Sequence, residues 1–319
     1  MKKDLHTLLK VARLYYLENL TQREVADRMN LSRIKIHRML SKAREEGIVE
    51  ITINEPPEDC SELEIRFEDS FQLKECIIVP TFADIGDIYR EMASALGGIL
   101  ERELKSGEYL GIGWGTTIRS VAEHVYFSKK IPVNVVPIAG GLGHTAEKIH
   151  SNSITALFAS RIGGKGFVLN CPFLADSAEA KTIFMNEPSV KEVFSLSREI
   201  STAIVSISNL GTDMTVRRLN IFSEDDIRVL RDAGAIGDIN AIYINEFGIP
   251  VENRLQDRVI NMETEDLKAA KHVIGVAFGN KKARAIKAAL LSKMIHTLIT
   301  DKNTAEAVLA ESAAVEMIK

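Results

Sequence analysis

The most restrictive feature of this sequence is an alternation that begins at residue 76 and continues almost to the end of the chain. Short runs rich in β-branched residues are followed repeatedly by longer segments with helical periodicity. Such alternation predicts an α/β fold, in which a mostly parallel sheet is covered on both faces by helices. The expected strands are Ile77–Pro80, Tyr109–Ile112, Val133–Ile138, Gly166–Leu169, Ala203–Ile207, Ala241–Ile244, Val273–Ala277 and Thr297–Ile299. The expected helices cover residues 85–105, 117–127, 151–162, 177–186, 224–233, 263–270, 281–292 and 301–310.

Pro56-Pro57 separates this region from a front segment of different character. Proline cannot extend a helix and holds its predecessor extended, so we place a domain boundary here. The 319 residues are enough for two unequal domains. We expect an all-α domain over residues 1–55, a linker over 56–75 and the α/β domain over 76–319. The linker contains a capping box, Ser61-Glu62-Leu63-Glu64, which predicts a helix that either bridges the domains or packs against a second subunit.

Positive charge is concentrated in the front segment, although the whole chain carries a formal net charge of −4. Residues 1–55 hold eleven Lys or Arg and eight Asp or Glu, a net of +3. Between Ser32 and Arg44 there are five basic residues and no acidic one. A phosphate backbone responds to such local asymmetry rather than to the average over the chain.

Three short helices are expected in this segment. Thr21 and Glu24 form a capping box that starts the second helix, and Asn30 suits the left-handed turn that follows it. Ser32 then caps a third helix, whose apolar stripe consists of Ile36, Met39, Leu40 and Ala43. Two short helices joined by a tight turn, with the second basic on its outer face, predict a helix-turn-helix that places its second helix in the major groove of DNA. A three-helix interaction module is the alternative.

The outer face of the third helix supplies the DNA-binding candidates, which are Arg33, Ile34, Lys35, His37, Arg38, Ser41 and Lys42. Arginine pairs with guanine or contacts phosphate, isoleucine contacts a thymine methyl group, and the lysines are placed for contacts that do not depend on sequence. After Gly47, the period-two pattern of Ile48–Ile53 predicts a strand that would belong to a short wing.

Glycine-rich turns follow several of the expected strands. They are Gly111–Thr117, Gly140-Gly141, Gly237-Asp238 and Gly279–Lys282. Glycine lets the main chain approach a ligand, and the N–H groups at the start of the following helix point at an anion. Ligands of open parallel sheets lie beyond the carboxyl ends of the strands, so these turns together predict a pocket for a small phosphorylated polyol. Any one of the turns, taken alone, is more typical of a packing turn.

Several other functions lack their signatures. The GxGxxG fingerprint of dinucleotide sites and the Walker GxxxxGK[ST] motif are both missing, so no cofactor is expected. His144 and His150 lack a third ligand at metal-binding spacing, and no metal site is expected. The three cysteines have no CxxC spacing, which favours buried thiols in a reducing cytoplasm. No apolar run approaches the ~18–20 residues that cross a bilayer, and the charged N-terminus is not that of a signal peptide.

The order of these motifs resembles the SorC/DeoR-type family of bacterial sugar-responsive transcriptional regulators. The resemblance is carried by Leu20–Val49, Gly111–Thr117, Gly140-Gly141, Gly237-Asp238-Ile239, Gly279–Leu290 and Leu298–Ala305, which span nearly the whole chain. It implies a DNA-reading domain followed by an effector domain with the fold of ribose-5-phosphate isomerase and glucosamine-6-phosphate deaminase. It also implies a homo-oligomer, usually a tetramer built as a dimer of dimers, and an effector that is a sugar, a sugar alcohol or one of their phosphates.

Matched by motif, the resemblance assigns effector-binding roles to several residues. Gly113, Gly115, Thr116 and Thr117 would hold an anion, next to Gly140 and Gly141. Asp238 would hydrogen-bond hydroxyl groups of the effector, and Lys282 would pair with a phosphate. Some members carry a lysine before the Gly-Gly pair that forms an imine with an aldehyde sugar, but this chain has Ala139 there. The His37-Arg38 pair and the stretch Leu169–Ala175 are similar to the polyol-responsive branch, such as erythritol regulators.

An enzyme is the competing hypothesis: a sugar-phosphate isomerase or deaminase with an appended helical domain. That chemistry needs a general base within reach of the substrate carbon. Asp176, Glu179, Asp238 and His144 are conceivable bases, but no pair has a spacing that specifies the role. We therefore expect a regulator that does no chemistry.

Overall fold

The computed structural model describes residues 2–51, 59–143, 149–212 and 214–316. The chain divides into two compact units, Met1–Pro57 and Glu58–Lys319, which are described separately below. Within the described residues, no helix combines the length and the apolar character that crossing a membrane requires.

The first unit consists of α1 (Lys2–Tyr16), α2 (Gln22–Met29) and α3 (Arg33–Glu45). Local chemistry sets their ends: Thr21 and Glu24 form a reciprocal capping box at α2, and Asn30 adopts a left-handed φ of 53° after it. The side chain of Ser32 accepts a hydrogen bond from the Lys35 amide at the start of α3. The three helices enclose one small core, formed by Val11, Leu14, Val25, Ala26, Ile36 and Leu40. The predicted helix-turn-helix is confirmed.

The predicted wing strand is not formed over residues 48–51, and Thr52 and Ile53 lie outside the described residues. The amides of Ile48 and Val49 both donate to the carbonyl oxygen of Ala43, at 2.9 and 3.0 Å. Their side chains pack against the small cluster of Leu8, Ala12 and Ala43. The apolar residues of this stretch therefore close the end of α3 instead of pairing with another strand.

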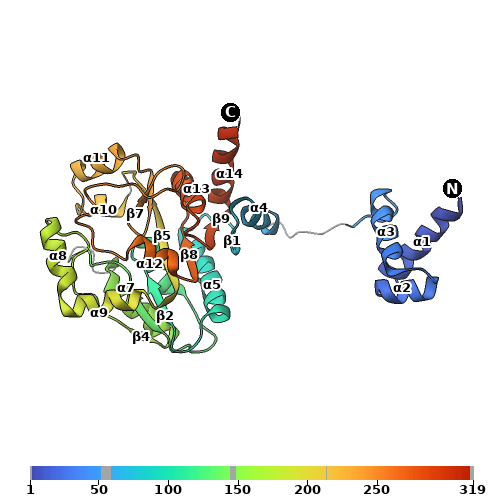
Figure 1. Ribbon diagram of the computed structural model, residues 1–319, viewed down its shortest axis with the longest axis horizontal. Coiled ribbons are helices and arrows are strands. Elements are labelled where there is room, and N and C mark those ends of the chain that lie inside the picture. Colours follow the sequence, from blue (N-terminus) through green and yellow to red (C-terminus); the bar gives the residue numbers. More distant parts are fainter. Residues whose placement is uncertain (1, 52–58, 144–148, 213, 317–319) are drawn as a thin grey trace. The chain divides into compact units, whose positions relative to one another are not determined.

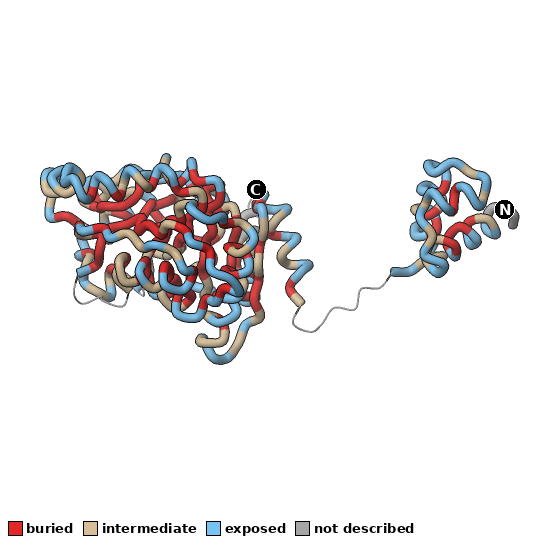
Figure 2. The backbone as a smooth tube through the Cα atoms, turned by 90° about the horizontal axis from the view of Figure 1, so that it is seen from below, coloured by how far each residue is buried: buried red, intermediate tan, exposed pale blue. Residues whose placement is uncertain are grey.

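The second unit is built on a sheet whose main path runs in the order β1-β9-β8-β5-β2-β3-β4, with every neighbouring pair along it parallel. The strands are β1 (Glu75–Val79), β2 (Tyr109–Ile112), β3 (Asn134–Pro137), β4 (Lys165–Gly166), β5 (Ile200–Asn209), β6 (Gly237–Ile239), β7 (Ile242–Ile244), β8 (His272–Val276) and β9 (Thr297–Asp301). Figure 2 shows the buried segments running through the middle of this unit. The predicted fold class, a helical domain followed by an α/β domain, is confirmed.

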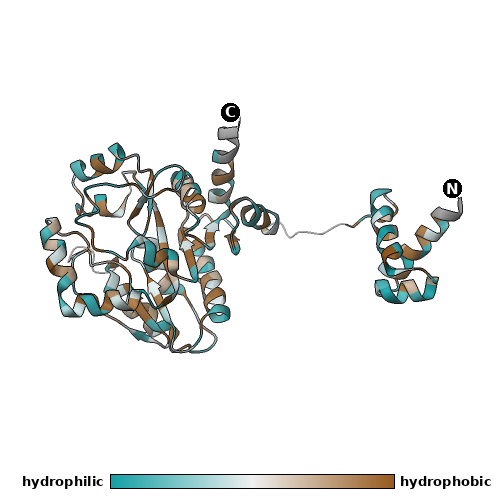
Figure 3. Ribbon diagram, viewed as in Figure 1, coloured by the Kyte–Doolittle hydropathy of each residue, from teal (hydrophilic) through white to brown (hydrophobic). Residues whose placement is uncertain are grey.

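Helices cover both faces of the sheet (Figure 1). They are α4 (Ser61–Phe71), α5 (Ile85–Glu103), α6 (Thr116–His124), α7 (Ser151–Ile162), α8 (Ala178–Asn186), α9 (Pro188–Ser197), α10 (Thr215–Arg218), α11 (Glu224–Asp232), α12 (Thr264–Ala269), the 3-10 helix η2 (Asn280–Lys282), α13 (Ala283–Leu291) and α14 (Lys302–Glu316). One core lies under α5, α6 and α7, another lies under α4, α9, α13 and α14, and a third, which includes Phe222 and Tyr243, lies beside α11. Strand residues alternate between the first two cores: Val205 belongs to one and Ile204 to the other. Figure 3 shows hydrophilic residues on the outer helices.

Helix α4 is part of the second unit. The predicted capping box at Ser61–Glu64 is not formed, because the N-cap residue is Cys60, its side chain makes no capping hydrogen bond, and the Glu64 carboxylate is engaged elsewhere. Phe67 and Phe71 are buried in the core beside β1. The carboxylates of Glu64 and Glu68 accept hydrogen bonds from the amides of Ile78 and Cys76 on that strand. The helix is thereby fixed to the edge of the sheet.

The sheet is not parallel throughout, because β5 continues past its parallel neighbours. Residues Ile207–Asn209 pair antiparallel with β6, and β6 turns back into β7. The turn between them consists of Asn240 and Ala241, with φ of 47° and 65°, which is the two-residue hairpin turn that suits the twist of paired strands. This antiparallel extension lies beyond the carboxyl end of β2 and beyond the parallel part of β5, at the edge of the sheet where a ligand is expected.

Candidate functional site

Helix α3 presents the predicted DNA-binding residues to solvent. Arg33, Ile34, Lys35, His37, Arg38 and Lys42 are exposed, and Ser41 is partly exposed. Ile34 is 68% exposed, whereas Ile36 on the opposite face is completely buried. An isoleucine so exposed on a helix with a well-formed core stripe has no packing role within the unit. The surface of α3 therefore has the mixture of cations and one apolar side chain that reads base edges and phosphates.

Most of the basic side chains on this face of α3 form no ion pair within the described residues. Within the described residues, the one ion pair of the α3 side chains joins Lys42 to Glu46, at 3.5 Å. No acidic side chain pairs with Arg33, Lys35, Arg38 or Arg44 in the part of the chain that the structure describes. Their charge remains available to an external polyanion.

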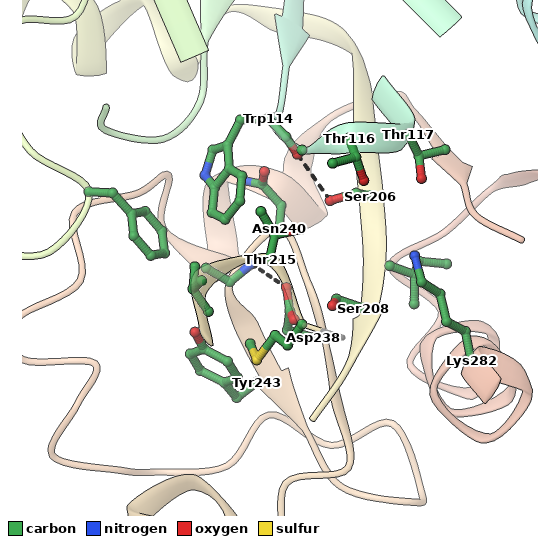
Figure 4. Close-up of a pocket in the computed structure, with 16 residues that line it drawn as sticks. Trp114, Thr116, Thr117, Ser206, Ser208, Thr215, Asp238, Asn240, Tyr243 and Lys282 are labelled. Carbon is green, nitrogen blue, oxygen red and sulfur yellow. Dashed lines mark hydrogen bonds between the residues drawn. The ribbon is translucent and has the colours of Figure 1, made fainter. Parts of the chain in front are cut away.

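A pocket lies at the carboxyl ends of β2 and β5, beside the antiparallel extension. Figure 4 shows its main side chains. Its lining residues are Trp114, Gly115, Thr116, Thr117, Phe173, Ser206, Ile207, Ser208, Met214, Thr215, Val216, Asp238, Asn240, Ala241, Tyr243 and Lys282. Five of the predicted effector-binding residues meet here: Gly115, Thr116, Thr117, Asp238 and Lys282. They come from three separate glycine turns, which the fold brings to one edge of the sheet.

Asp238 is a buried carboxylate on β6, only 6% exposed. Its Oδ2 accepts a hydrogen bond of 2.8 Å from the amide of Ala241, which stabilises the tight turn. Its Oδ1 is buried and has no hydrogen-bond partner among the described residues. Burial raises the pKa of Asp238 to about 6, while the Ala241 amide and the positive charge of Lys282 oppose that shift. The group is therefore a largely ionised hydrogen-bond acceptor near neutral pH, with one oxygen available to a ligand.

The wall opposite the acceptors is aromatic. Trp114 and Phe173 meet edge to face with ring centroids 5.0 Å apart, and Phe173 stacks on Phe222 at 6.0 Å. The indole Nε1 of Trp114 is buried without a hydrogen-bond partner among the described residues. Burial, followed by the nearby charges of Asp238 and Asp226, raises the pKa of Tyr243 well above its usual range, so its hydroxyl stays neutral. An aromatic wall beside unused donors and acceptors suits a molecule with several hydroxyl groups.

The other side of the pocket is positive. Helix α6 begins directly at Gly115, whose φ of 126° requires glycine, and no side chain caps this end of the helix. Thr116 and Thr117 follow in its first turn, so two hydroxyl groups accompany its free amide groups. Lys282 reaches from η2 toward the same side, as Figure 4 shows. Helix terminus and ammonium group together favour an anion.

Three predicted effector-binding glycines do not line this pocket. A Cβ on Gly113 would lie 2.5 Å from Oδ1 of Asn240, and one on Gly140 would lie 2.2 Å from the carbonyl oxygen of Pro172. A Cβ on Gly141 would lie 2.1 Å from the His150 ring. Gly141 lines a separate open groove together with His150 and Asn152. These three glycines therefore allow the chain to pack closely around the pocket without lining it.

Sequence motifs did not point to about half of the lining. Ser206 and Ser208 lie on the extended end of β5, Met214 and Thr215 lie at the start of the short helix α10, and Asn240 lies in the turn between β6 and β7. The side chain of Ser206 donates a hydrogen bond of 3.2 Å to the carbonyl oxygen of Trp114 and so ties β5 to the glycine turn. The alternation of Ser206 and Ser208 with apolar residues near the end of this strand is the signal that the sequence offers for them.

The residues considered as general bases do not gather around the pocket. Asp238 lines it, whereas Asp176 and Glu179 are exposed near the start of α8, and His144 lies outside the described residues. Glu179 accepts a hydrogen bond from the Ser177 side chain, which lowers its pKa. The described residues also contain no group of three or more His, Cys, Asp or Glu side chains that would hold a metal ion.

Comparison with protein families divides the chain in the same way. Residues 55–310 match the family described as "Putative sugar-binding domain". Residues 10–46 match region 4 of sigma-70. The first match covers most of the α/β unit, and the second contains the end of α1, all of α2 and α3 with its exposed basic face.

Similar proteins of known role are full-length matches. The transcriptional regulator LsrR of Klebsiella pneumoniae is 31% identical, over 94% of this chain and 92% of its own. The sorbitol operon regulator of Klebsiella pneumoniae is 28% identical, over 96% of this chain and 98% of its own. The erythritol catabolism regulatory protein EryD of Brucella abortus is 26% identical, over 95% and 96%. The crystal structure of the full-length sorbitol operon regulator SorC from Klebsiella pneumoniae superposes with a TM-score of 0.73 at 27% identity, covering 96% of this chain and 99% of that one.

Proposed function

The chain belongs to the SorC/DeoR-type family of sugar-responsive transcriptional regulators, and from this premise we propose which residues read DNA and which receive the effector. It is a DNA-binding regulator of a carbohydrate or polyol operon and not an enzyme, as its full-length relatives are named regulators. Its α/β unit is a sugar-binding domain. The isomerase or deaminase hypothesis is not favoured by any of these relatives.

For the DNA-binding unit, α3 is the reading helix. Arg33, Ile34 and Arg38 contact base edges in the major groove, with His37 and Ser41 beside them. Lys35 and Lys42 contact phosphates. The support for these roles is the exposure of the side chains, above all of Ile34, and the lack of acidic partners on this face among the described residues.

For the effector domain, the ligand is a small polyol or sugar that carries one phosphate. The observation that carries this proposal is the buried Oδ1 of Asp238, which has no partner among the described residues and faces a pocket with Lys282 on its rim. A carboxylate acceptor selects hydroxyl groups, and the start of α6 with Lys282 selects an anion. One molecule with hydroxyl groups at one end and a phosphate at the other satisfies both.

Binding of this ligand is non-covalent. The position before Gly140 is Ala139, which is completely buried and pairs with Asn261 in an isolated antiparallel bridge. An alanine has no amine that would form an imine with an aldehyde sugar. The ligand is therefore held by hydrogen bonds, charge and the aromatic wall, and an acyclic sugar alcohol phosphate suits the site as well as a ring sugar does.

The regulator acts as a homo-oligomer in the bacterial cytoplasm. Helix-turn-helix proteins commonly read two half-sites as dimers, and a dimer or a dimer of dimers places two or four copies of α3 on one operator. The family resemblance supports a tetramer, and the location follows from the position of the operator DNA.

Isothermal titration calorimetry tests the ligand proposal. Sorbitol 6-phosphate and erythritol 4-phosphate are titrated into the full-length protein, and each unphosphorylated polyol serves as the matched ligand. We expect the phosphorylated compound of a pair to bind at least about tenfold more tightly, because a charge-assisted contact is worth ~1.5–3 kcal/mol. Lys282→Ala removes this preference. Equal affinity for both members of each pair, or preference unchanged in Lys282→Ala, contradicts the phosphate assignment.

A further inference from the structure

Lys282 stands on a very short element, and something must fix its position. η2 spans only Asn280–Lys282, and the amide of Lys282 donates a hydrogen bond of 2.8 Å to the carbonyl oxygen of Gly279. Gly279 itself has a φ of 107°, and its α-carbon faces open space. Three residues of 3-10 helix do not hold a stable orientation by themselves. The direction of the Lys282 side chain therefore depends on what holds Gly279.

The backbone of Gly279 is held by the buried hydroxyl group of Thr304 on α14. The Gly279 amide donates a hydrogen bond of 2.6 Å to Oγ1 of Thr304. The Thr304 hydroxyl in turn donates a short hydrogen bond to Oδ1 of Asp301, the last residue of β9. Thr304 is completely buried and Asp301 is 3% exposed. Gly279 is partly exposed, but the hydroxyl that accepts from its amide is completely buried and held in place, so this hydrogen bond fixes the backbone at Gly279.

Asp301 is itself held at its second oxygen. Thr81, just after β1, donates a hydrogen bond of 2.8 Å to Oδ2 of Asp301, and the Asn303 amide donates one of 3.0 Å to the Thr81 hydroxyl. Both oxygens of the carboxylate are thus used, and the group has one orientation. A chain of hydrogen bonds with all members satisfied is rigid, because each bond restricts the next.

We propose that Thr304, oriented by Asp301, is a positioning residue that sets the turn from which Lys282 reaches the effector. This inference rests on the proposed function, since it takes Lys282 as the residue that pairs with the phosphate. Thr304 does not line the pocket and acts only through Gly279. A second tether holds the other end of the turn, where the Asn209 side chain donates 2.9 Å to the carbonyl oxygen of Lys281. The turn is thereby clamped between β5 and α14.

The test uses three substitutions in the full-length protein. Thr304→Val keeps the shape and removes the hydroxyl, and Thr304→Ser restores the hydroxyl. Thr300→Val is the matched control, because Thr300 is also completely buried at the end of β9 but its Oγ1 has no hydrogen-bond partner among the described residues. All three remove or alter a buried threonine, and only Thr304→Val breaks the tether.

The first measurement needs no ligand: amide hydrogen exchange of the peptide that contains residues 279–282. We expect Thr304→Val to accelerate exchange there by about tenfold or more, because local opening no longer has to break the hydrogen bond from Gly279 to Thr304. Thr304→Ser and Thr300→Val exchange like the unaltered protein. Unchanged exchange in Thr304→Val overturns the proposal, as does equal acceleration in Thr300→Val.

The second measurement is a double-mutant cycle with Lys282→Ala, with sorbitol 6-phosphate as the probe and inorganic phosphate as a competitor. We expect Thr304→Val to weaken the probe about fivefold or more in the unaltered background and by less than about twofold in Lys282→Ala, since residues that act as a unit are not additive. The neutral probe sorbitol shows no such loss. Full additivity overturns the positioning role even when the proposed function stands. If the unaltered protein binds neither probe, the proposed ligand class is wrong. The exchange measurement then tests by itself whether Thr304 fixes the turn at Gly279.

Discussion

Asp238 is the residue on which the character of the pocket depends, because it is the one pocket carboxylate buried with an unused oxygen in the described part of the chain. Its buried charge costs the folded state free energy that a protonated carboxyl group does not. The folded-state pKa is about 6 and the ordinary value is 3.8, so the folded protein binds the proton more tightly than the unfolded chain. Folding stability therefore falls as the pH rises from about 4 to about 6, and the loss is complete above that window.

Asp238→Asn removes this dependence. We expect the variant to gain stability relative to the unaltered protein as the pH rises through 4–6, by up to about 3 kcal/mol, since one pKa unit corresponds to ~1.4 kcal/mol. Urea denaturation at pH 4.5 and pH 7.5 measures the difference. Subtracting the two proteins cancels other titrating groups such as His272, whose pKa burial lowers to about 4 and whose effect has the opposite sign. A pH-independent difference would mean that Asp238 titrates normally.

Gly140 represents the glycines that build the site without touching it. A Cβ there would lie 2.2 Å from the carbonyl oxygen of Pro172 and 2.8 Å from the amide nitrogen of Phe173, and both of these atoms belong to the main chain. We expect Gly140→Ala to lower the free energy of unfolding by about 1–3 kcal/mol or more through overpacking. Gly98→Ala is the control, because Gly98 lies exposed on α5 with open space around its α-carbon. That change adds up to about 1 kcal/mol of helix propensity. Thermal melts of both variants should move in opposite directions.

At the scale of elements, α3 separates base reading from phosphate binding. We expect Arg38→Ala to weaken operator binding by ~1–3 kcal/mol and to relax its sequence preference, whereas Lys42→Ala weakens all sequences alike and reduces the salt slope by about one. Fluorescence anisotropy with operator and scrambled duplexes, from 50 to 300 mM salt, distinguishes the two effects. Arg198→Ala, a similar loss of charge at the exposed residue that follows α9, leaves both unchanged. Equal behaviour of the α3 and α9 variants would argue against α3 as the reading helix.

The sequence predicts regular helices and strands with strong periodicity well. It predicts the short elements that shape the pocket less well. The helix-turn-helix could be predicted because its caps, at Thr21 and Ser32, are local in sequence. The antiparallel extension could not, because β6 is only three residues long and its pairing with Ile207–Asn209 depends on tertiary contacts. Helix α9 was missed, and β4 was predicted four residues long but has only Lys165–Gly166, at the edge of the sheet.

The same distinction applies to the site. Glycine turns mark a position in the sequence because only glycine adopts a φ such as the 126° of Gly115. They do not tell whether the space that they leave is filled by a ligand or by the chain itself, as Gly113 and Gly140 illustrate. Side chains such as Ser206 and Asn240 enter the pocket through pairing across 30 residues or more, which no local pattern records.

At the scale of the whole molecule, the two units must be coupled if the effector is to regulate DNA binding. A ligand shifts the protein between two states only by the difference of its affinities for them. The pocket lies in the second unit and the reading helix in the first, and the chain between them passes through residues 52–58. Regulation therefore requires that the ligand in the second unit changes the affinity of the first unit for DNA.

Thermodynamic linkage makes the coupling measurable in both directions. If sorbitol 6-phosphate changes the operator Kd by some factor, the operator must change the Kd of the ligand by the same factor. We expect the ligand to raise or lower the operator Kd by a factor of about 5–150. In Lys282→Ala this factor approaches one. The operator affinity of that variant without ligand stays unchanged, because Lys282 is not part of the DNA-binding unit. Anisotropy with and without ligand gives the first factor, and calorimetry with and without operator gives the second. A factor that is unchanged in Lys282→Ala would show that the ligand acts at some place other than the pocket that holds Asp238 and Lys282.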